Sequence, residues 1–449
     1  MMKSSRKIVL SFVLFFICNV NTFAKANETY DKLDAMIGIM EIIDANYVSE
    51  TKSEDLAVGA IKGVVAALND PYSQYMEDEE FKNEIEGYYV GIGLRSEVRS
   101  DDRLVVIAPV PGTPAYKAGI FPKDIIIKID GKSTEGMPYI EAISLMRGKA
   151  GKKVKLTIVR SGVLNPIEFN LVREKIKPKT VVAKMFDNGI AYIRLTMFNA
   201  RSADNIKKAL TNYRKQGMKS LILDLRGNMG GTLDSAVNIA SMFIKEKKLA
   251  VSTKGRTTES KKEYFTSGDG EFSDLEFIIL VNKYSASASE VLSGAMQDFK
   301  RALIIGCNTF GKGVLQTTYP LSKGTILKLT IAKYYLPSGR SINCSDNKDS
   351  KNGITPDVEV EVSKDDEKQL CTQEYDDEYQ EATSAKNKHQ RSVVDKEKKV
   401  EDKVLNKAIE IIKENKIAEK IASSKATEVI KENRTAEKAE LSQPYKKKK

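Results

Sequence analysis

Apolar residues between positions 30 and 68 recur at helical spacing, beginning with Leu33, Met36, Ile37 and Met40. Spacings of three and four residues place such side chains on one face of a helix. Asn69-Asp70-Pro71 then forms a turn signal. The pattern predicts a helical N-terminal segment over residues 27–78, whose helices cover a core or an interface.

From about Gly87 the apolar residues come in short runs separated by Pro-Gly, Ala-Gly and Asp-Gly pairs. Short runs between such turn signals are typical of strands. They predict a small mixed α/β domain over residues 79–176. We expect its strands at 89–94, 104–108, 125–129 and 154–159, with one helix at 139–146.

Between residues 180 and 365 apolar strands alternate with amphipathic segments, which predicts an α/β core over residues 177–365. We expect strands at 190–195, 221–225 and 277–281 and helices at 203–213 and 233–243. The whole chain is therefore predicted to be a multidomain α/β protein.

Residues 366–449 form a highly charged C-terminal tail in which Ala408–Lys420 recurs as Ala426–Lys438. The 18-residue period equals five helical turns, so both copies would present the same face. Because the apolar stripe is thin and the charges are mixed, we expect a solvated helix or a disordered tail rather than a helix for a specific partner. The run Lys446–Lys449 allows weak peripheral contact with anionic lipid.

Residues 1–26 have the pattern of a signal peptide, with three basic residues before the apolar stretch Ile8–Val20. Cleavage is expected after Ala24 or Ala26, and an uncleaved anchor is the alternative. The chain is therefore expected to be exported to the periplasm, or to stay on the outer face of the inner membrane.

The net charge of +11 lies mainly at the two ends of the chain. Residues 1–26 carry +4 and residues 395–449 carry +5, which leaves +2 for everything between. A nearly neutral middle argues against a nucleic-acid groove. The chain has one histidine, His389, so neither a Ser-His-Asp triad nor a multi-histidine zinc site can form within it.

Three cysteines follow the signal segment, and an odd number leaves one unpaired. Cys344 and Cys371 flank a polar stretch and could pair, whereas Cys307 follows an apolar run and is expected to be buried.

Three segments of the core carry candidate chemistry. Asp224–Gly231 is a glycine-rich turn after a buried strand; without a following lysine it suits an oxyanion hole better than a phosphate site. Ser285–Glu290 is a serine-rich turn between a strand and a helix, where a nucleophile or a simple helix cap can lie. Thr309–Gln316 places Lys312 between two glycines, as a catalytic group or as an exposed turn lysine.

The domain at 79–176 resembles a PDZ domain in its loop Gly91-Ile92-Gly93-Leu94 and in the later run Pro109–Ala115. In PDZ domains the loop amides receive a chain-terminal carboxylate and a strand edge pairs with the peptide. The resemblance implies peptide binding at Gly91, Ile92, Gly93 and Leu94, although a Gly-x-Gly turn alone would be unspecific. Arg147, after the predicted helix, is either a sensor of the bound peptide or an ordinary surface arginine.

The ordered motifs together resemble the carboxyl-terminal processing (tail-specific) proteases, a family of Ser/Lys peptidases with a PDZ domain. The likeness extends from about Tyr30 to Val360 and includes Leu68–Ser73, Tyr335–Ile342 and Gly353–Asp357. It implies Ser287 as the nucleophile, Lys312 as the general base and Gln316 as its support. No metal or cofactor is implied, and the substrates would be proteins with apolar C-terminal tails.

This chemistry requires a neutral lysine, whose ordinary pKa is about 10.4. Lowering that pKa to about 7 costs roughly 4 kcal/mol, which burial can supply. The amide of Ala288 and that of Gly230 or Gly231 would face the oxyanion. Two features depart from the family pattern: Met229 replaces a common proline, and residues 344–350 look inserted.

Two alternatives remain at this level. A secreted PDZ adaptor with an inert α/β partner would bind chain ends without cutting them. Within the protease hypothesis, the nucleophile could instead be Ser285 or Ser289. The sequence leaves natural substrates and oligomeric state open.

Overall fold

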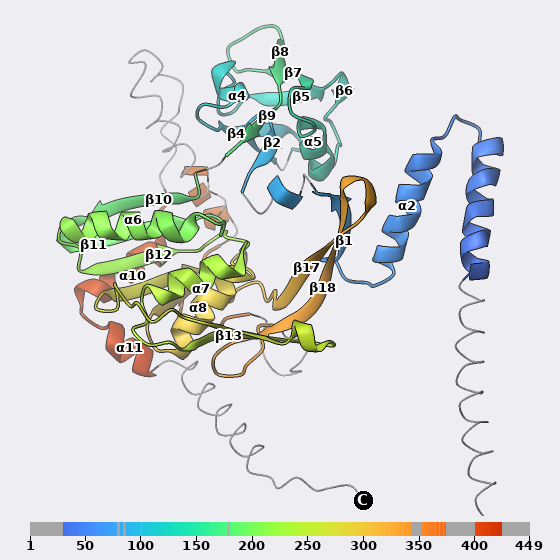
Figure 1. Cartoon of the computed structure of the whole chain (residues 1–449). Coiled ribbons are helices and arrows are strands. Elements are labelled where there is room, and N and C mark those ends of the chain that lie inside the picture. Colours follow the sequence, from blue (N-terminus) through green and yellow to red (C-terminus); the bar gives the residue numbers. More distant parts are fainter. Residues whose placement is uncertain are drawn as a thin grey trace, which may run out of the picture. The chain divides into compact units, whose positions relative to one another are not determined.

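A computed structural model describes residues 30–78, 81–83, 87–99, 101–177, 179–343, 353–363, 365–367, 369–370, 372–373 and 400–423. The signal segment, the Cys344–Cys371 pair, the second copy of the repeat and the inserted residues 344–350 lie outside these ranges. The described residues belong to two compact units. Figure 1 shows the elements, which are described below unit by unit.

The first unit contains the N-terminal helices and part of a β-hairpin. A helix spans residues 30–46 and α2 spans Ser53–Ala66, as the helical spacing predicts. Strand β1 (Gln74–Glu77) pairs antiparallel with the first part of β18 (Thr325–Tyr335), whose hairpin partner is β17 (Val314–Pro320). None of the α2 side chains is buried, so these helices do not cover a core within the described chain; an interface stays a prediction.

The second unit begins with the small mixed domain, built on the strand order β3-β4-β5-β7-β8. Its elements include β3 (Leu94–Val98), β4 (Leu104–Pro109), β5 (Ile125–Ile129), β6 (Lys132–Ser133), β7 (Lys153–Val159), β8 (Ile167–Val172), α4 (Pro114–Lys117) and α5 (Tyr139–Met146). The strand expected at 89–94 is interrupted: β2 (Tyr89–Gly91) pairs with β9 (Glu174–Ile176), and β3 starts after Gly93. Gly93 has a φ of +79°, which ends the extended conformation there.

The α/β core is a six-stranded sheet in the order β10-β11-β12-β15-β16-β19. Only β10 is antiparallel to its neighbour. The strands are β10 (Val181–Phe186), β11 (Ile190–Leu195), β12 (Ser220–Asp224), β15 (Glu276–Val281), β16 (Leu303–Gly306) and β19 (Val358–Glu359). The three predicted core strands are thus present within one residue of their expected limits.

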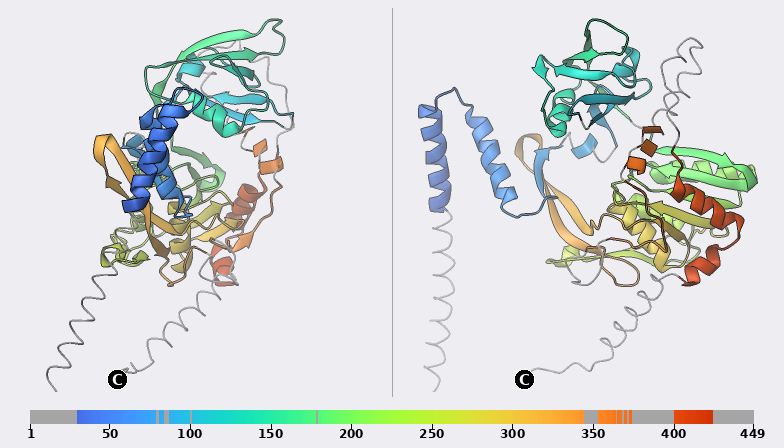
Figure 2. Two further views of the ribbon diagram at one scale, coloured as in Figure 1. Left: turned by 90° about the vertical axis from the view of Figure 1, so that its right-hand side faces the viewer. Right: turned by 180° about the vertical axis from the view of Figure 1, so that it is seen from behind.

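Alternate strand residues face opposite sides of this sheet, and each side has its own helices. Residues such as Ile193, Leu223 and Ile279 pack against α6 (Ser202–Lys215), α7 (Leu233–Ser241) and α8 (Ala288–Asp298). Residues of opposite parity, including Ile222 and Ile278, pack against α10 (Lys403–Lys413) and α11 (Ile417–Ser423). Figure 2 shows α10 and α11 (red) beside the strands in the view from behind.

The packing of α10 corrects our expectation for the C-terminal tail. Residues 403–423 are helical, as one alternative held, but they are not solvated on all sides. Val404, Ala408, Ile411 and Ile412 are at most 6% exposed because they cover the second face of the sheet. With the partly buried Leu405 and Ile409, these residues form an apolar face wide enough to make this helix part of the core.

A smaller antiparallel sheet was not predicted from the sequence. In the second unit β13 (Leu249–Gly255) pairs with β14 (Lys262–Phe265) and with the last residues of β18. Within the described residues no helix is both long and apolar enough to cross a bilayer.

Candidate active site

Ser287 lies at the turn between β15 and α8, where a sharp change of direction is needed. Its backbone has φ 55° and ψ −115°, a sparsely populated conformation for a residue with a side chain. Ser287 is half-buried, whereas Ser285 and Ser289 are completely buried. The hydroxyls of those two serines donate to the carbonyls of Leu225 (2.9 Å) and Asn228 (2.8 Å). The geometry therefore favours Ser287 over Ser285 and Ser289 as a nucleophile.

A buried carboxylate, Glu290, connects the serine turn to the lysine loop. Its Oε2 accepts hydrogen bonds from the amides of Ser287 (2.8 Å) and Lys312 (2.9 Å). Its Oε1 accepts from the Thr309 hydroxyl (2.5 Å) and the Gly311 amide (2.6 Å). Because one oxygen atom binds both amides, Ser287 and Lys312 are brought together although they are 25 positions apart in the chain.

Our sequence analysis gave Glu290 no role of its own. The signal was present, because Ser287 and Glu290 have the Ser-x-x-Glu spacing of a capping box at the start of a helix. Burial raises the pKa of Glu290, while the hydrogen bonds it accepts act in the opposite direction. The four donors are neutral, so no formal positive charge among them balances the carboxylate.

The glycine turn after β12 lies directly against Ser287. A side chain on Gly230 would meet the Ala286 carbonyl at 2.7 Å and the Ser287 Cβ at 2.9 Å. A side chain on Gly231, whose φ is +137°, would overlap the carbonyl of Phe198. Glycine at these two positions is therefore a steric requirement of the close approach between the turns.

The amides of the two glycines in this turn are used differently. The Gly230 amide already donates to Asn228 Oδ1 (2.9 Å), so in this structure it is not directed at a substrate. Among the hydrogen bonds of the described residues, none uses the amide of Gly231 or Ala288. These two amides remain as the candidates for binding an oxyanion.

Lys312 is held in a loop that only glycines allow. Gly311 has a φ of +90°, and a side chain on Gly313 would meet the Asn343 amide nitrogen at 2.5 Å. The Gly313 carbonyl accepts from the Tyr334 amide (2.8 Å), which fixes the loop against β18. Lys312 is half-buried rather than an exposed turn lysine.

Gln316 lies on β17 and its Nε2 donates to Thr330 Oγ1 on β18 (3.3 Å). The Thr330 amide in turn donates to Ser73 Oγ (3.0 Å), and the Ser73 hydroxyl donates to Asp70 Oδ2 (2.5 Å). Asp70 and Ser73 belong to the motif Leu68–Ser73, which thus supports the hairpin that carries Gln316.

Two further motifs hold the far end of α8 rather than take part in chemistry. Asp298 accepts from the Ser338 amide (2.8 Å) and pairs with Arg340 (2.9 Å). Gln297 donates to Asp357 Oδ1 (2.9 Å) and accepts from Arg340 (2.6 Å). The segments 335–342 and 353–357 are therefore attached to the helix that begins at Ser287.

The predicted peptide-binding loop of the small domain has the backbone that a chain-end site needs. The Gly93 carbonyl accepts from Thr113 Oγ1 (3.2 Å), and a side chain on Gly93 would overlap that of Thr113. Ile92 is buried in the domain core, and β3, which starts at Leu94, is the terminal strand of its sheet. One edge of β3 therefore has no strand partner within the described part of the sheet, and the Ser96 carbonyl of β3 accepts from the Tyr139 hydroxyl of α5 (2.8 Å).

Arg147 lies against the first residue of this loop, since a side chain on Gly91 would come within 3.9 Å of its Cγ. It follows α5, is exposed, and its guanidinium carbon lies 5.8 Å from the ring centre of Tyr89. This contact is an ordinary surface cation–π pair, so a sensing role stays a prediction.

Cys307 is only partly buried and has a free thiol. Burial raises the pKa of this thiol.

Comparison with known proteins supports the sequence resemblance. Residues 189–360 match the model of peptidase family S41, residues 105–160 that of the PDZ domain, and residues 19–80 that of the activating protease CtpB N-terminal domain. The carboxy-terminal processing protease CtpA of Bacillus subtilis is 36% identical over 361 residues, which cover 79% of this chain and 75% of that protein.

Two other proteins show the same likeness. A probable CtpA-like serine protease of Staphylococcus haemolyticus is 40% identical over 324 residues; they cover 71% of this chain but less than two thirds (62%) of that protein. The solved photosystem II D1 C-terminal processing protease is 28% identical, with a TM-score of 0.45 over 73% of this chain and 92% of the other. The 36% identity to the Bacillus subtilis protease, of which 75% is covered, together with the S41 and PDZ matches, shows that the chain belongs to the carboxyl-terminal processing proteases, the serine-type peptidases of family S41 that carry a PDZ domain.

Proposed function

We propose that this chain is an exported endopeptidase that hydrolyses peptide bonds with Ser287 as nucleophile and Lys312 as general base. The observation that carries the proposal is the position of these two residues. The backbone amides of Ser287 and Lys312 donate to the same oxygen of Glu290. Ser287 is half-buried, whereas the other serines of its turn are buried.

In this mechanism neutral Lys312 accepts the proton of the Ser287 hydroxyl as its oxygen attacks the substrate carbonyl. The developing oxyanion is stabilised by the amides of Gly231 and Ala288, each donor contributing about 3 kcal/mol. The Lys312 ammonium then gives its proton to the leaving amine, and water repeats the sequence on the acyl-enzyme. The role of Gln316 as the support of Lys312 is proposed from the family resemblance.

We propose that the PDZ domain selects substrates by their C-terminal tails. The Gly91–Leu94 loop would receive the terminal carboxylate, and the edge of β3 would pair with the preceding residues. An apolar tail fits a loop whose neighbours Ile92 and Leu94 belong to the domain core.

Export is proposed from the charged and apolar pattern of residues 1–26. Expression of the full chain followed by N-terminal sequencing of the mature protein tests it. A mature N-terminus near residue 25 or 27 is expected, and an intact Met1 on a protein retained in the cytoplasm would contradict export.

Cleavage of an unfolded protein with an apolar tail tests the catalytic assignment. Ser287→Ala and Lys312→Met should abolish turnover, whereas Ser285→Ala and Ser289→Ala should not. The matched substrate carries the same tail with a C-terminal amide, which removes the carboxylate and should raise KM. Binding of the free tail without cleavage by the unaltered protein would instead support the PDZ adaptor.

A further inference from the structure

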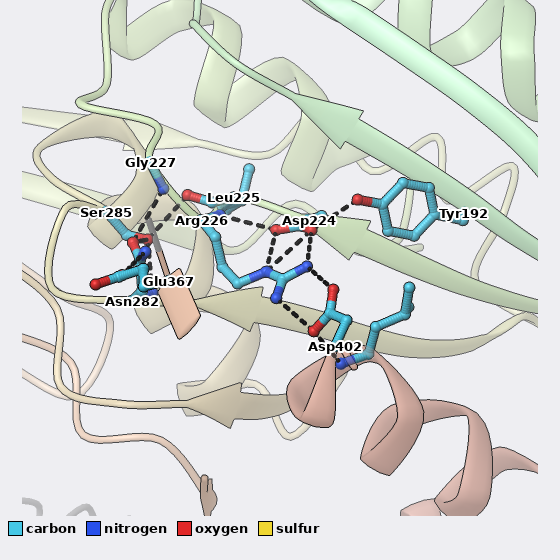
Figure 3. Close-up of polar contacts among 10 residues, drawn as sticks. Tyr192, Asp224, Leu225, Arg226, Gly227, Asn282, Ser285, Glu367 and Asp402 are labelled. Atoms are coloured by element: carbon cyan, nitrogen blue, oxygen red, sulfur yellow. Dashed lines mark hydrogen bonds and ion pairs between the residues drawn. The ribbon is translucent and has the colours of Figure 1, made fainter. Parts of the chain in front are cut away.

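The C-terminal segment beyond the S41 match contacts both turns of the candidate active site. Figure 3 shows the Arg226 guanidinium between two carboxylates, Asp224 at the end of β12 and Asp402 at the start of α10. Arg226 Nη1 and Nη2 donate to the two oxygens of Asp402, each at 2.8 Å. Its Nε and Nη2 donate to Asp224 at 3.0 and 2.6 Å.

Asp224 does not depend on the arginine alone. It also accepts from the Tyr192 hydroxyl (2.7 Å) and from the Arg226 backbone amide (2.9 Å). Asp402, by contrast, supplies the only acceptor recorded for Arg226 Nη1 among the described residues. The Arg226 side chain is only 11% exposed, so removal of Asp402 would leave Nη1 without an acceptor in a nearly buried position, while Nε and Nη2 keep Asp224.

Arg226 immediately precedes the turn that presents Gly231. The Gly227 amide donates to Asn282 Oδ1 (2.9 Å), and the Asn282 amide donates to Ser285 Oγ (3.0 Å). A displacement of Arg226 would therefore reach the serine turn through Gly227 and Asn282.

A second contact from the C-terminal segment reaches the same place. Glu367 Oε1 accepts from Asn282 Nδ2 (2.7 Å), and Oε2 pairs with Lys283 (2.7 Å). The two carboxylates, Asp402 and Glu367, thus hold the ends of β12 and β15 respectively.

The element that carries Asp402 is itself fixed. Asp402 Oδ1 caps α10 by accepting from the Leu405 amide (3.0 Å), and Ala408 and Ile411 of α10 are at most 1% exposed against the sheet. The Asp402 carboxylate that binds Arg226 is therefore carried by a rigid helix. Preorganisation of a turn requires that the residues supporting it are held in this way.

We propose that Asp402 is a positioning residue for catalysis: by clamping Arg226 against Asp224 it fixes the Gly227–Gly231 turn in the geometry that binds the oxyanion. This inference rests on the proposed function. It implies that α10 contributes to catalysis by the peptidase.

The test compares Asp402→Asn with Glu410→Gln in the full chain. Asparagine keeps the helix cap but removes the charge that Arg226 binds. Glu410→Gln makes the same charge change on the exposed side of the same helix. Asp402→Asn should lower kcat about tenfold with KM within about twofold, because tail binding is unaffected while the turn is displaced. Glu410→Gln should leave both constants unchanged.

Amide hydrogen exchange of the segment 224–232 gives a readout independent of turnover. In Asp402→Asn exchange in this segment should rise about tenfold while that of β16 stays constant. Asp402→Ser also caps the helix but cannot reach Arg226, so it should behave like Asp402→Asn. It takes the place of Asp402→Asn in the test if that variant fails to fold.

The outcomes separate the two hypotheses. If the unaltered chain and Ser287→Ala are equally inactive, the proposed protease function fails, while a rise in exchange in Asp402→Asn would still support the clamp. If the unaltered chain cleaves, and both Asp402 variants keep full kcat and normal exchange, the clamp is overturned and the protease remains.

Discussion

Asp224 and Glu290 are both fully buried carboxylates that fix turns of the active site, yet their surroundings differ in charge. Asp224 binds the Arg226 guanidinium, whereas Glu290 binds three backbone amides and one hydroxyl. Arg226 holds the pKa of Asp224 at about 2 in spite of the opposing effect of burial. At Glu290 burial outweighs the hydrogen bonds, and the pKa is raised.

The difference shows that a positive partner is not needed to use a buried carboxylate as a structural link. Dipoles alone satisfy the hydrogen-bonding capacity of Glu290, and its Oε2 joins the serine turn to the lysine loop. Replacement of Glu290 should therefore be more damaging than replacement of Asp224, because every donor around Glu290 needs an acceptor. The predictions below test this contrast.

The largest effect is expected for Glu290→Gln. Each oxygen of Glu290 accepts two hydrogen bonds. In either orientation of the glutamine side chain, its NH2 group, which cannot accept, would face two donors. We expect kcat to fall at least about 100-fold, since the serine turn and the lysine loop lose their common anchor. Steady-state cleavage of the apolar-tailed substrate measures it.

Glu276→Gln is the control, because it makes the same change to a hydrogen-bonded carboxylate at the start of β15, at the end opposite the serine turn, where Glu276 accepts from Ser220. It should retain nearly full activity. Equal losses in both variants would show that loss of either carboxylate impairs the fold, and would remove the special position of Glu290.

A smaller effect on stability, with a defined pH dependence, is expected for Asp224→Asn. The folded pKa is lowered from 3.8 to about 2, so Asp224 stabilises the fold above pH 3.8, and this contribution is lost as the pH falls through about 2. The shift corresponds to about 2 kcal/mol. Breaking the buried pair should cost about 3 kcal/mol at neutral pH.

Urea unfolding of both proteins from about pH 7 to about pH 3 measures this contribution. The difference in unfolding free energy between the unaltered chain and Asp224→Asn should shrink as the pH falls below about 4. A difference that stays constant over this range would argue against ionised Asp224 as the source of the stability.

The smallest effects are expected for Thr309→Val and Tyr192→Phe, which each remove one hydroxyl donor from one of the carboxylates. A hydrogen bond to a charged group contributes about 2 kcal/mol. Thr309→Val should cost more than Tyr192→Phe, because Asp224 keeps its guanidinium while Glu290 has no cation among its donors, and because Thr309 Oγ1 also accepts from the Ile354 amide (2.7 Å). Thermal unfolding of the two variants ranks them, and the reverse order would contradict the contrast.

Much of the fold follows from local patterns. The mainly apolar runs Ile190–Leu195 and Phe277–Val281 predict strands that are buried on both faces, and strands lie there in the structure. The serine turn, the glycine turn and the lysine loop are likewise located by glycine and serine content, because few other residues allow such turns.

The contacts that join these turns could not be predicted, because they connect distant positions. The pairing of Arg226 with Asp402 spans 176 positions, and no spacing rule relates them. Helix α10 carried a usable signal: Val404, Ala408 and Ile411 are spaced by four and three residues behind an Asp that can cap a helix. Its many charges obscured this pattern.

The shared carboxylate of Glu290 also limits how this enzyme can be rebuilt. Transplanting the serine turn from a related protease without the loop that holds the base would affect three of the four hydrogen bonds to Glu290 at once, because Thr309, Gly311 and Lys312 all lie on that loop. Recombination between family members should therefore succeed only when crossover points leave residues 285–313 in one inherited block, so that nucleophile and base are exchanged together.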